Sequence, residues 1–341
     1  MIIGGLALLG MAGCRFAPWP EEVPLPEEEQ AGTETIYSLI PEVEIIRSAG
    51  PADLSSITHV SNQVYLAASD SGGTICEVVV QRSGRPNSLP RFTVRRTFVL
   101  ENGKDIEGLA YDPLCGTVWA ADEADGSIVE HDLEDGRSLR ILDSPECFRR
   151  CRPNQGLESL AMRPNGLELW TCNEQALEGD GDECQPETGT LVRLTRFSRA
   201  NGRDDWRLTG QWAYRTGRIH GGFFRGMRVR SVVDLSVMED GTVLVLEREL
   251  SCRATIPSFM SYIYRVDCAN ATDVRDFATL RSPYIVPVLR QRLFAEDVGF
   301  ANYEGMCIGP QGEGEIPLLL VSDGDDGAFA CLYWLSLSAI F

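Results

Sequence analysis

Acidic residues recur at a similar place in short repeated segments of this chain, and they are its most plentiful reactive groups. Glu107, Glu158, Asp234 and Glu304 each follow an apolar or aromatic residue near the start of an apolar segment. The Asp234 copy aligns only to within a residue or two, because its turn, Met238–Thr242, is shorter. Carboxylates in numbers are what Ca²⁺ prefers, and a bound metal ion can polarise a phosphoryl oxygen or activate water without any histidine. We therefore predict that these four residues ligate a divalent cation, with calcium as the expected ion.

A second set of acids ends the second apolar run of each repeat: Asp70, Glu123, Glu174, Glu249 and Asp323. Acids at strand ends also cap turns and accept hydrogen bonds from exposed backbone amides. Turn chemistry is therefore the alternative interpretation for both sets.

Basic residues gather in one stretch of this acidic chain, residues 215–230, which holds five arginines. Guanidinium groups suit phosphate or carboxylate. Arg218, His220 and Arg225 are therefore predicted to contact an anionic substrate, and the alternative is a solvated loop that balances neighbouring acid. The chain offers few of the residues needed for hydrolysis by a serine triad, since it has three histidines and no Gly-x-Ser-x-Gly segment.

The repeats themselves predict the fold. Five copies of two apolar runs separated by a turn follow one another at intervals of roughly 50 to 75 residues, which is typical of a radial β array. Equivalent positions of every copy then converge on one axis, and the recurring acids form a ring. We predict an all-β, five-bladed β-propeller, or a six-bladed one if a long insertion hides a degenerate blade.

Further strands complete each predicted blade. Glu42–Arg47 is the N-terminal strand expected to close the last blade, because an open ring would leave an exposed edge. Outer strands are predicted at 74–80, 92–100, 127–132, 138–142, 191–197, 208–214, 261–266 and 275–280. The insertions at 144–154, 178–187, 215–230 and 281–301 are long enough to hide a sixth blade or to form a lid.

Composition narrows the function classes. The formal net charge is −19 with 43% hydrophobic residues, which argues against nucleic acid as a partner because phosphate binding needs a basic surface. We expect a soluble, monomeric body. The acidity reflects either solubility or attraction of metal cations.

The N-terminal segment predicts export. Residues 1–13 form an uncharged apolar run of signal-peptide length before Cys14. Met11-Ala-Gly-Cys14 resembles the lipobox of bacterial lipoproteins, which implies lipidation at Cys14, although Met11 stands where Leu is usual and no basic residue precedes the run. Residues 14–41 are rich in Pro and Glu and are interpreted as a tether, followed by a propeller domain at 42–341. The expected location is the bacterial cell envelope, with membrane contact through the lipid alone; the alternatives for the apolar run are an ordinary secretory signal or a buried strand.

Ten cysteines follow Cys14, an even number that favours disulfide bonds in an exported protein. Local pairs Cys147/Cys151, Cys172/Cys184 and Cys252/Cys268 are reasonable bridges, although sequence alone does not fix the connectivity.

The sequences of the repeats resemble a bacterial phytase-like propeller family often labelled esterase-like activity of phytase. The segments that carry the resemblance are Asp105–Pro113, Asn154–Trp170, Asp234–Arg248, Asn302–Pro310 and Leu318–Asp325, which together span most of residues 50–341. The resemblance implies an exported, calcium-dependent propeller with phosphoester or carboxylic ester hydrolysis as its expected activity. Fold alone does not confer the reaction.

The leading hypothesis is therefore an envelope lipoprotein that hydrolyses a small anionic or ester substrate with the help of calcium. A second hypothesis is a non-catalytic propeller in which the ion only pins the blades and the loops bind an envelope partner. A lactonase-like propeller enzyme is a third. It would also use a central calcium, so the metal alone does not separate it from the first.

Overall fold

The computed structural model describes residues 39–40, 46–47, 53–81, 91–222, 228–253, 256–299, 301–310, 315–324 and 328–335. The chain divides into two units, residues 1–34 and 35–341. The first unit lies outside the described residues, as do the predicted signal peptide and Cys14. Within the described part, no helix is long and apolar enough to cross a membrane.

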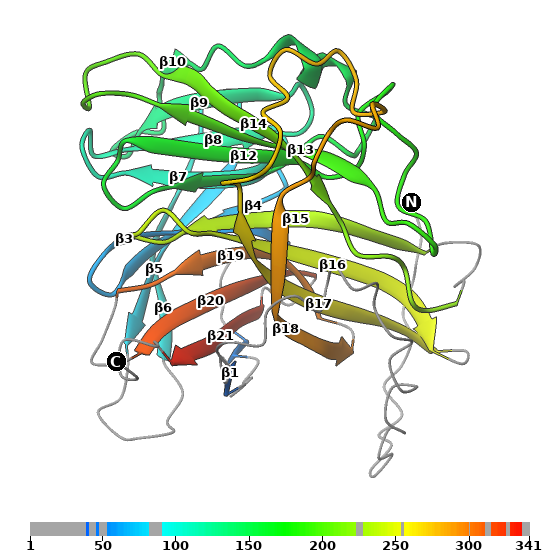
Figure 1. Ribbon diagram of the computed structural model, residues 1–341. Coiled ribbons are helices and arrows are strands. Elements are labelled where there is room, and N and C mark those ends of the chain that lie inside the picture. Colours follow the sequence, from blue (N-terminus) through cyan, green and yellow to red (C-terminus); the bar gives the residue numbers. More distant parts are fainter. Residues whose placement is uncertain are drawn as a thin grey trace. The chain divides into compact units, whose positions relative to one another are not determined.

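The second unit is a β-propeller built from five antiparallel sheets (Figure 1). Each four-stranded sheet is a meander of consecutive strands, and the fifth sheet gains strands from the N-terminal side of the chain. The first two sheets contain β3 (Leu54–Ser61), β4 (Val64–Ser69), β5 (Thr74–Gln81) and β6 (Arg91–Val99), then β7 (Ile106–Asp112), β8 (Thr117–Asp122), β9 (Ser127–Asp132) and β10 (Ser138–Ile141). The next two contain β11 (Leu157–Met162), β12 (Glu168–Asn173), β13 (Leu191–Ser198) and β14 (Arg207–Arg215), then β15 (Val229–Val237), β16 (Val243–Arg253), β17 (Ile256–Asp267) and β18 (Leu289–Gly299). The last contains β19 (Asn302–Ile308), β20 (Glu315–Asp323) and β21 (Ala328–Leu335), with β1 (Leu39–Ile40) and β2 (Ile46–Arg47) paired to β21.

The first strand of each sheet lies at the centre. β3 contacts β7, β7 contacts β11, β11 contacts β15, β15 contacts β19, and β19 contacts β3 again. The five strands therefore form a closed ring around a channel, which we call the inner ring, while outer strands such as β10 and β21 lie at the periphery in Figure 1. Equivalent residues of the repeats converge on the channel, as the sequence predicts.

Local sequence explains why the inner strands turn where they do. In the β7–β8 hairpin, Gly116 has a φ of 70°, and the Asp112 carboxylate accepts hydrogen bonds from the backbone amides of Leu114 and Cys115. A side chain at that φ would be strained, and an Asx turn satisfies amides that the sheet no longer pairs. The hairpin fixes the register of β7, and with it the height of Glu107 along the channel.

The predicted outer strand at residues 275–280 is wrong. These residues form a loop whose Leu280 packs with Val274 on Ala213, and the outer strand of that sheet is β18 instead. β18 lies in the insertion that we considered for a sixth blade. No sixth sheet occurs among the described residues.

The N-terminal strands lie on the outer edge of the last sheet. The predicted closing segment Glu42–Arg47 contributes Ile46–Arg47, which pair with Phe329 and Ala328 of β21. Leu39–Ile40, which we placed in the tether, also pair with β21. That edge of the sheet is therefore covered by chain from the other end of the domain.

The predicted local disulfides are not formed. No disulfide joins Cys147 to Cys151, Cys172 to Cys184, or Cys252 to Cys268. The last pair is excluded by topology, because Cys252 lies opposite Pro257 at one end of the β16–β17 hairpin and Cys268 follows the other end. Some ten residues of strand, at about 3.3 Å each, separate them. Cys172 and Cys184 are instead small buried side chains.

Candidate functional site

A β-bulge occurs at the same point of every inner strand. The register shifts between Leu54 and Ser56, Ile106 and Gly108, Leu157 and Ser159, Val232 and Asp234, and Tyr303 and Gly305. One residue of each strand is therefore left unpaired, as a bulge requires. These five residues form one layer of the inner ring, which we call the bulge layer: Ser55, Glu107, Glu158, Val233 and Glu304. Three of the four predicted ring acids occupy it.

Asp234 is not one of them, because it lies one residue beyond the bulge. Its Oδ2 accepts a hydrogen bond from the backbone amide of Met306 at 2.6 Å, and its Oδ1 accepts one from Leu235 at 2.7 Å. The equivalent residues Gly108 and Gly305 lie against the next inner strand so closely that an added Cβ would come within 3 Å of backbone atoms. Asp234 therefore joins two inner strands and lies one position away from the bulge layer that holds the other three predicted ligands.

Acids from the second strands complete a cluster around the bulge layer, and Arg248 lies among them. Arg248 is an ion-pair partner of both Glu304 and Glu174, the latter at 3.2 Å. Asn302 donates hydrogen bonds to Glu304 and Asp323, both at 2.9 Å. We call this end of the channel the acidic mouth; its carboxylates are Asp70, Asp105, Glu107, Glu123, Glu158, Glu174, Glu304 and Asp323.

The crowded carboxylates hold protons more tightly than free ones. Burial, followed by the charges of Asp105 and Glu123, raises the pKa of Glu107 well above its ordinary value. Burial and the charge of Glu174 do the same to the pKa of Glu158, and the nearby Arg248 only partly opposes both shifts. The mouth therefore holds more carboxyl groups than its guanidinium could balance if all of them were ionised.

The donor set fits a hard cation. Carboxylate oxygens with an excess of negative charge are what calcium requires. The carboxylates of the mouth do not form a compact group of ligand atoms, however. Among the described residues, a group of three possible ligand atoms within 4.8 Å of one another is formed by Asp112, Cys115 and Glu130. That group lies outside the channel, and Arg199 and Arg140 already neutralise its two carboxylates.

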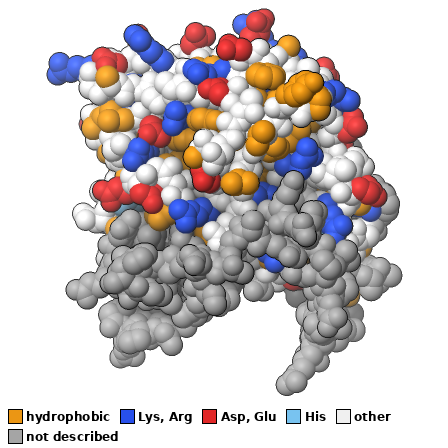
Figure 2. Space-filling model, in the orientation of Figure 1, with side chains coloured by type: hydrophobic (Ala, Val, Ile, Leu, Met, Phe, Trp, Pro, Cys, Tyr) orange, Lys and Arg blue, Asp and Glu red, His pale blue; other side chains and the backbone are white. Residues whose placement is uncertain are grey.

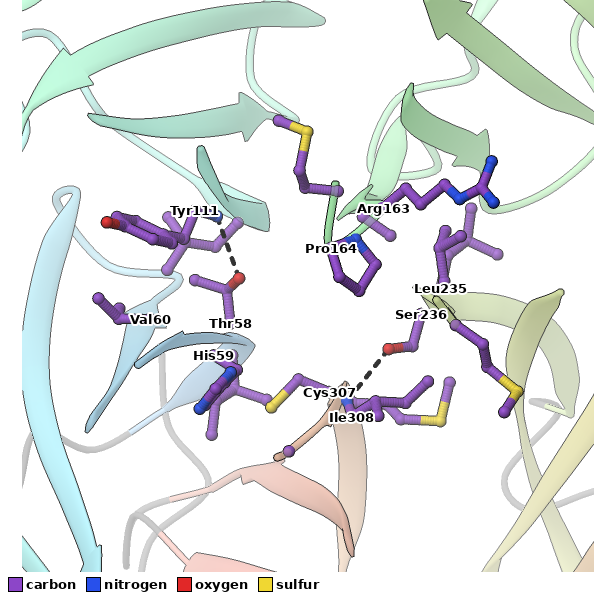
Figure 3. Close-up of a pocket in the computed structure, with 18 of the residues that line it drawn as sticks. Thr58, His59, Val60, Tyr111, Arg163, Pro164, Leu235, Ser236, Cys307 and Ile308 are labelled. Carbon is purple, nitrogen blue, oxygen red and sulfur yellow. Dashed lines mark hydrogen bonds between the residues drawn. The ribbon is translucent and has the colours of Figure 1, made fainter. Parts of the chain in front are cut away.

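An apolar layer follows the bulge layer along the channel. Two residues beyond each bulge, the inner strands place Ile57, Leu109, Leu160, Leu235 and Met306, and each is at most 2% exposed. We call these residues the apolar ring. Beyond it a cavity of about 270 Å³ opens at the far end of the channel (Figure 3). Along each inner strand, the apolar ring thus lies between the bulge layer and the rest of the cavity lining.

The predicted substrate contacts lie elsewhere. His220 Nδ1 is 3.1 Å from Glu249 Oε2, and the backbone amides of His220 and Gly221 donate to Glu249 Oε1 at 2.9 Å each. These bonds help to lower the pKa of Glu249 to about 2 even though burial opposes them. The backbone carbonyl of Arg218 accepts a hydrogen bond from the buried Arg230.

This group belongs to a buried network between two sheets. Glu247 accepts hydrogen bonds there from Tyr214, Arg230 and Arg290. The structure does not join Arg218 or His220 to the acidic mouth, and Arg225 lies outside the described residues.

Sequence reasoning missed Arg248 and the cavity. Arg248 stands between two acids in Glu247-Arg248-Glu249, where alternation on a strand sends its side chain to the opposite face from theirs. This alternation indicates that Arg248 and the two glutamates lie on opposite faces of the strand. Only the contacts with other strands show that the face with Arg248 is directed toward the channel.

A closed ring of five inner strands with an acidic mouth defines a β-propeller whose polar groups converge on its axis. A family model described as "Phytase-like: Esterase-like activity of phytase" matches residues 52–326, so the chain belongs to this family.

Comparison with solved structures adds less. Similar solved structures include the β-propeller domain of Cps50 (Swd1) from Myceliophteria thermophila, at 10% identity over 87% of this chain and 99% of that one, with a TM-score of 0.35. A putative oxidoreductase (glucose dehydrogenase) from Thermus thermophilus matches at 13% identity over 86% of this chain and 100% of its own, with a TM-score of 0.40. Hydrazine synthase from Kuenenia stuttgartiensis matches at 11% identity over 82% of this chain and 59% of its own, with a TM-score of 0.35. These likenesses are too loose to support a function, and a search of curated proteins finds no match.

Proposed function

We propose that the five sheets are the five blades of a propeller that binds calcium at its acidic mouth and hydrolyses a small phosphoester or carboxylic ester there. One residue carries the proposal. Glu158 is 8% exposed, and its carboxylate accepts no hydrogen bond from any described residue, while Glu174, Glu107 and Glu123 act on it with like charge. A buried carboxylate in that setting is either protonated or paired with a cation. Family membership supports the ester chemistry.

Glu107, Glu158 and Glu174 are the residues that would hold the ion, with Glu304 kept in place by Arg248 and Asn302. When bound, the ion would polarise the acyl or phosphoryl oxygen and lower the pKa of a coordinated water. Burial and the charges of Asp105 and Glu123 raise the pKa of Glu107, so without a bound cation this carboxyl holds a proton more tightly than a free one. The apolar ring closes the channel below, so the substrate would approach from the mouth.

We also propose that this protein is located in the bacterial cell envelope. Its support is the sequence Met11-Ala-Gly-Cys14, which fits lipidation of Cys14 after export. Mass spectrometry of membrane-extracted protein would show a diacylated Cys14 at the mature N terminus, whereas an unmodified N terminus elsewhere would refute the anchor.

Calorimetry and thermal unfolding test the cation. After thorough chelation, added calcium should bind and raise the melting temperature, because a ligand of the folded state stabilises it by mass action. Glu158→Gln should weaken calcium binding by more than about tenfold, since it removes one charged ligand. Glu134→Gln, in an exposed turn, is the matched control and should bind calcium like the unmodified protein. Absence of calcium binding to the unmodified protein would refute the site.

Hydrolysis is tested separately with p-nitrophenyl phosphate, p-nitrophenyl acetate and a γ-lactone, each with EGTA and with excess calcium. Turnover of the phosphoester or acetate that EGTA abolishes and calcium restores is the expected result. Opening of the lactone alone would favour the lactonase-like alternative.

A non-catalytic propeller is the second candidate, and one observation favours it. Arg248 already bridges Glu174 and Glu304, so the mouth contains a resident positive charge that could serve stability alone. Calcium-dependent stabilisation without turnover of any of the three substrates would establish this function and refute the enzyme.

A further inference from the structure

The cavity at the far end of the channel is a second place where a ligand could bind, and it differs from the mouth in chemistry. It is lined by residues of all five inner strands. The apolar ring forms its floor, and Met162, Pro164, Val237 and Ile308 contribute to its walls. Pockets for small molecules are commonly mostly apolar with a few placed polar groups.

Two hydroxyl groups are the placed polar groups. Thr58 Oγ1 accepts a hydrogen bond from the backbone amide of Tyr111 at 3.0 Å, and Ser236 Oγ accepts one from Ile308 at 3.1 Å. Figure 3 shows Thr58 and Ser236 on opposite sides of the cavity, each bridging to the neighbouring strand. Since each hydroxyl already accepts, its own O–H proton is available for donation to a ligand oxygen.

The charged residues of the lining lie at its rim or are already paired, and the carboxylate of Glu239 is at the exposed rim. Arg163 is paired with Glu168 at 2.6 Å and donates to the backbone carbonyl of Glu239, at the rim. Burial lowers the pKa of His59, and its Nε2 lies 3.1 Å from the carbonyl of Asn62, so the ring is neutral at pH 7. A charged group placed against the apolar ring would lose its hydration without gaining a counter-charge there.

We infer that this cavity binds a small uncharged organic molecule, with an apolar body against the apolar ring and an oxygen acceptor that receives a hydrogen bond from Ser236 or Thr58. The volume of about 270 Å³ lies just below the range of drug-sized pockets, which limits the ligand to roughly one ring with a short substituent. The inference does not rest on calcium binding, because the apolar ring stands between the two ends.

Three probes of similar size separate the features of the site. Acetophenone has an apolar ring and a ketone oxygen, ethylbenzene lacks the acceptor, and benzoate carries a charge. Binding is measured by ligand-observed NMR and calorimetry on the full chain. Acetophenone should bind; ethylbenzene should bind about fivefold more weakly, the value of one hydrogen bond. Benzoate should bind more weakly than acetophenone by over about a hundredfold. Equal binding of benzoate and acetophenone would refute the neutral ligand class.

Variants locate the binding. Ile308→Trp should fill the cavity and abolish acetophenone binding, and Ser236→Ala should weaken it about fivefold while the protein stays folded. Ser261→Ala, a change at a buried serine outside the cavity, is the matched control and should leave binding unchanged. Glu158→Gln should also leave it unchanged, which separates this site from the acidic mouth. Failure of acetophenone to bind the folded unmodified protein, or undiminished binding by both cavity variants, would overturn the inference.

Discussion

The two ends of the central channel are built from the same five strands, yet they support opposite chemistry. At the bulge layer the strands place Glu107, Glu158 and Glu304, and two residues further the same faces place only aliphatic side chains or methionine. The bulge makes the difference, because it releases one residue of each strand from the sheet, and in three strands that residue is one of these acids. Past the bulge regular pairing resumes, and each residue of the apolar ring packs in a core cluster between neighbouring sheets. A propeller channel can therefore hold a charged site and an apolar site only a few residues apart along each strand.

The charge of the molecule shows the same contrast between surface and channel. On the face in view in Figure 2, acidic and basic side chains are interspersed. In the acidic mouth, by contrast, the guanidinium of Arg248 pairs with Glu174 and Glu304, and the described residues there are otherwise mostly carboxylic acids. The net charge of −19 therefore does not come from solvent-exposed surface side chains alone.

The largest expected effect comes from placing a charge in the apolar ring. Leu160→Asp should lower the free energy of unfolding by at least about 3 kcal/mol, because a carboxylate there would be buried without a partner. Leu160→Met, which keeps the volume and the apolar character, should cost less than about 1.5 kcal/mol. Denaturant unfolding measures both. A loss below about 1 kcal/mol for Leu160→Asp would show that water reaches the ring and that the two ends are not separated.

Removing the guanidinium of the mouth should have the next largest effect. In chelator, Arg248→Gln should lower the free energy of unfolding by about 2 kcal/mol, since Glu174 and Glu304 lose their counter-charge. Calorimetry should show calcium binding about tenfold more tightly to this variant, because the mouth becomes more negative. Arg281→Gln changes an exposed arginine and should alter neither quantity. Weaker calcium binding by Arg248→Gln would mean that the guanidinium organises the ligands.

The pH dependence of stability should differ between the mouth and the Glu249 network. Glu107 and Glu158 have a raised pKa in the folded protein, so the stability they contribute is present below about 4.5, their ordinary value, and is lost as the pH rises through the raised pKa. Glu249 behaves oppositely, because its pKa falls to about 2 and its contribution is lost only as the pH falls toward that value.

Thermal melts in chelator should therefore show falling stability above about pH 4.5, and calcium should remove that fall. Glu158→Gln should flatten the profile in the same range. A profile that rises steadily from about pH 5 to about pH 8 in chelator, and is the same in Glu158→Gln, would contradict the raised pKa of the mouth.

The smallest effect is expected at the cavity. Ser236→Ala should cost about 1 kcal/mol of unfolding free energy, since the backbone amide of Ile308 loses its acceptor. Ser261 is a buried serine whose hydroxyl has no partner among the described residues, so Ser261→Ala should be neutral or slightly stabilising. Equal losses for the two variants would show that the Ser236 hydroxyl does not join neighbouring inner strands.

The sequence determined much of the inner half of this propeller. Recurring pairs of apolar runs predicted the paired strands that begin each sheet, and Glu107, Glu158 and Glu304 were found because their strands repeat the order apolar, acid, small residue. The small residue was the signal for the bulge register. The strand of Asp234 lacks that order, because Leu235 follows the acid, and the structure places Asp234 with Gly108 and Gly305 and Val233 with the ring acids. The period of a strand is two, so an error of one residue moves a side chain to the other face.

Only the tertiary structure decided what these elements do together. Arg248, the apolar ring and the cavity arise from contacts between strands about 50 or more residues apart, which local sequence does not encode. The outer strand β18 was likewise misplaced, because edge strands see solvent and carry a weak hydrophobic pattern. What the chain specified locally was the alternation and the turns. Closure of the ring decided which acids lie close together, because that depends on the register of each inner strand relative to its neighbours and on the position of its bulge.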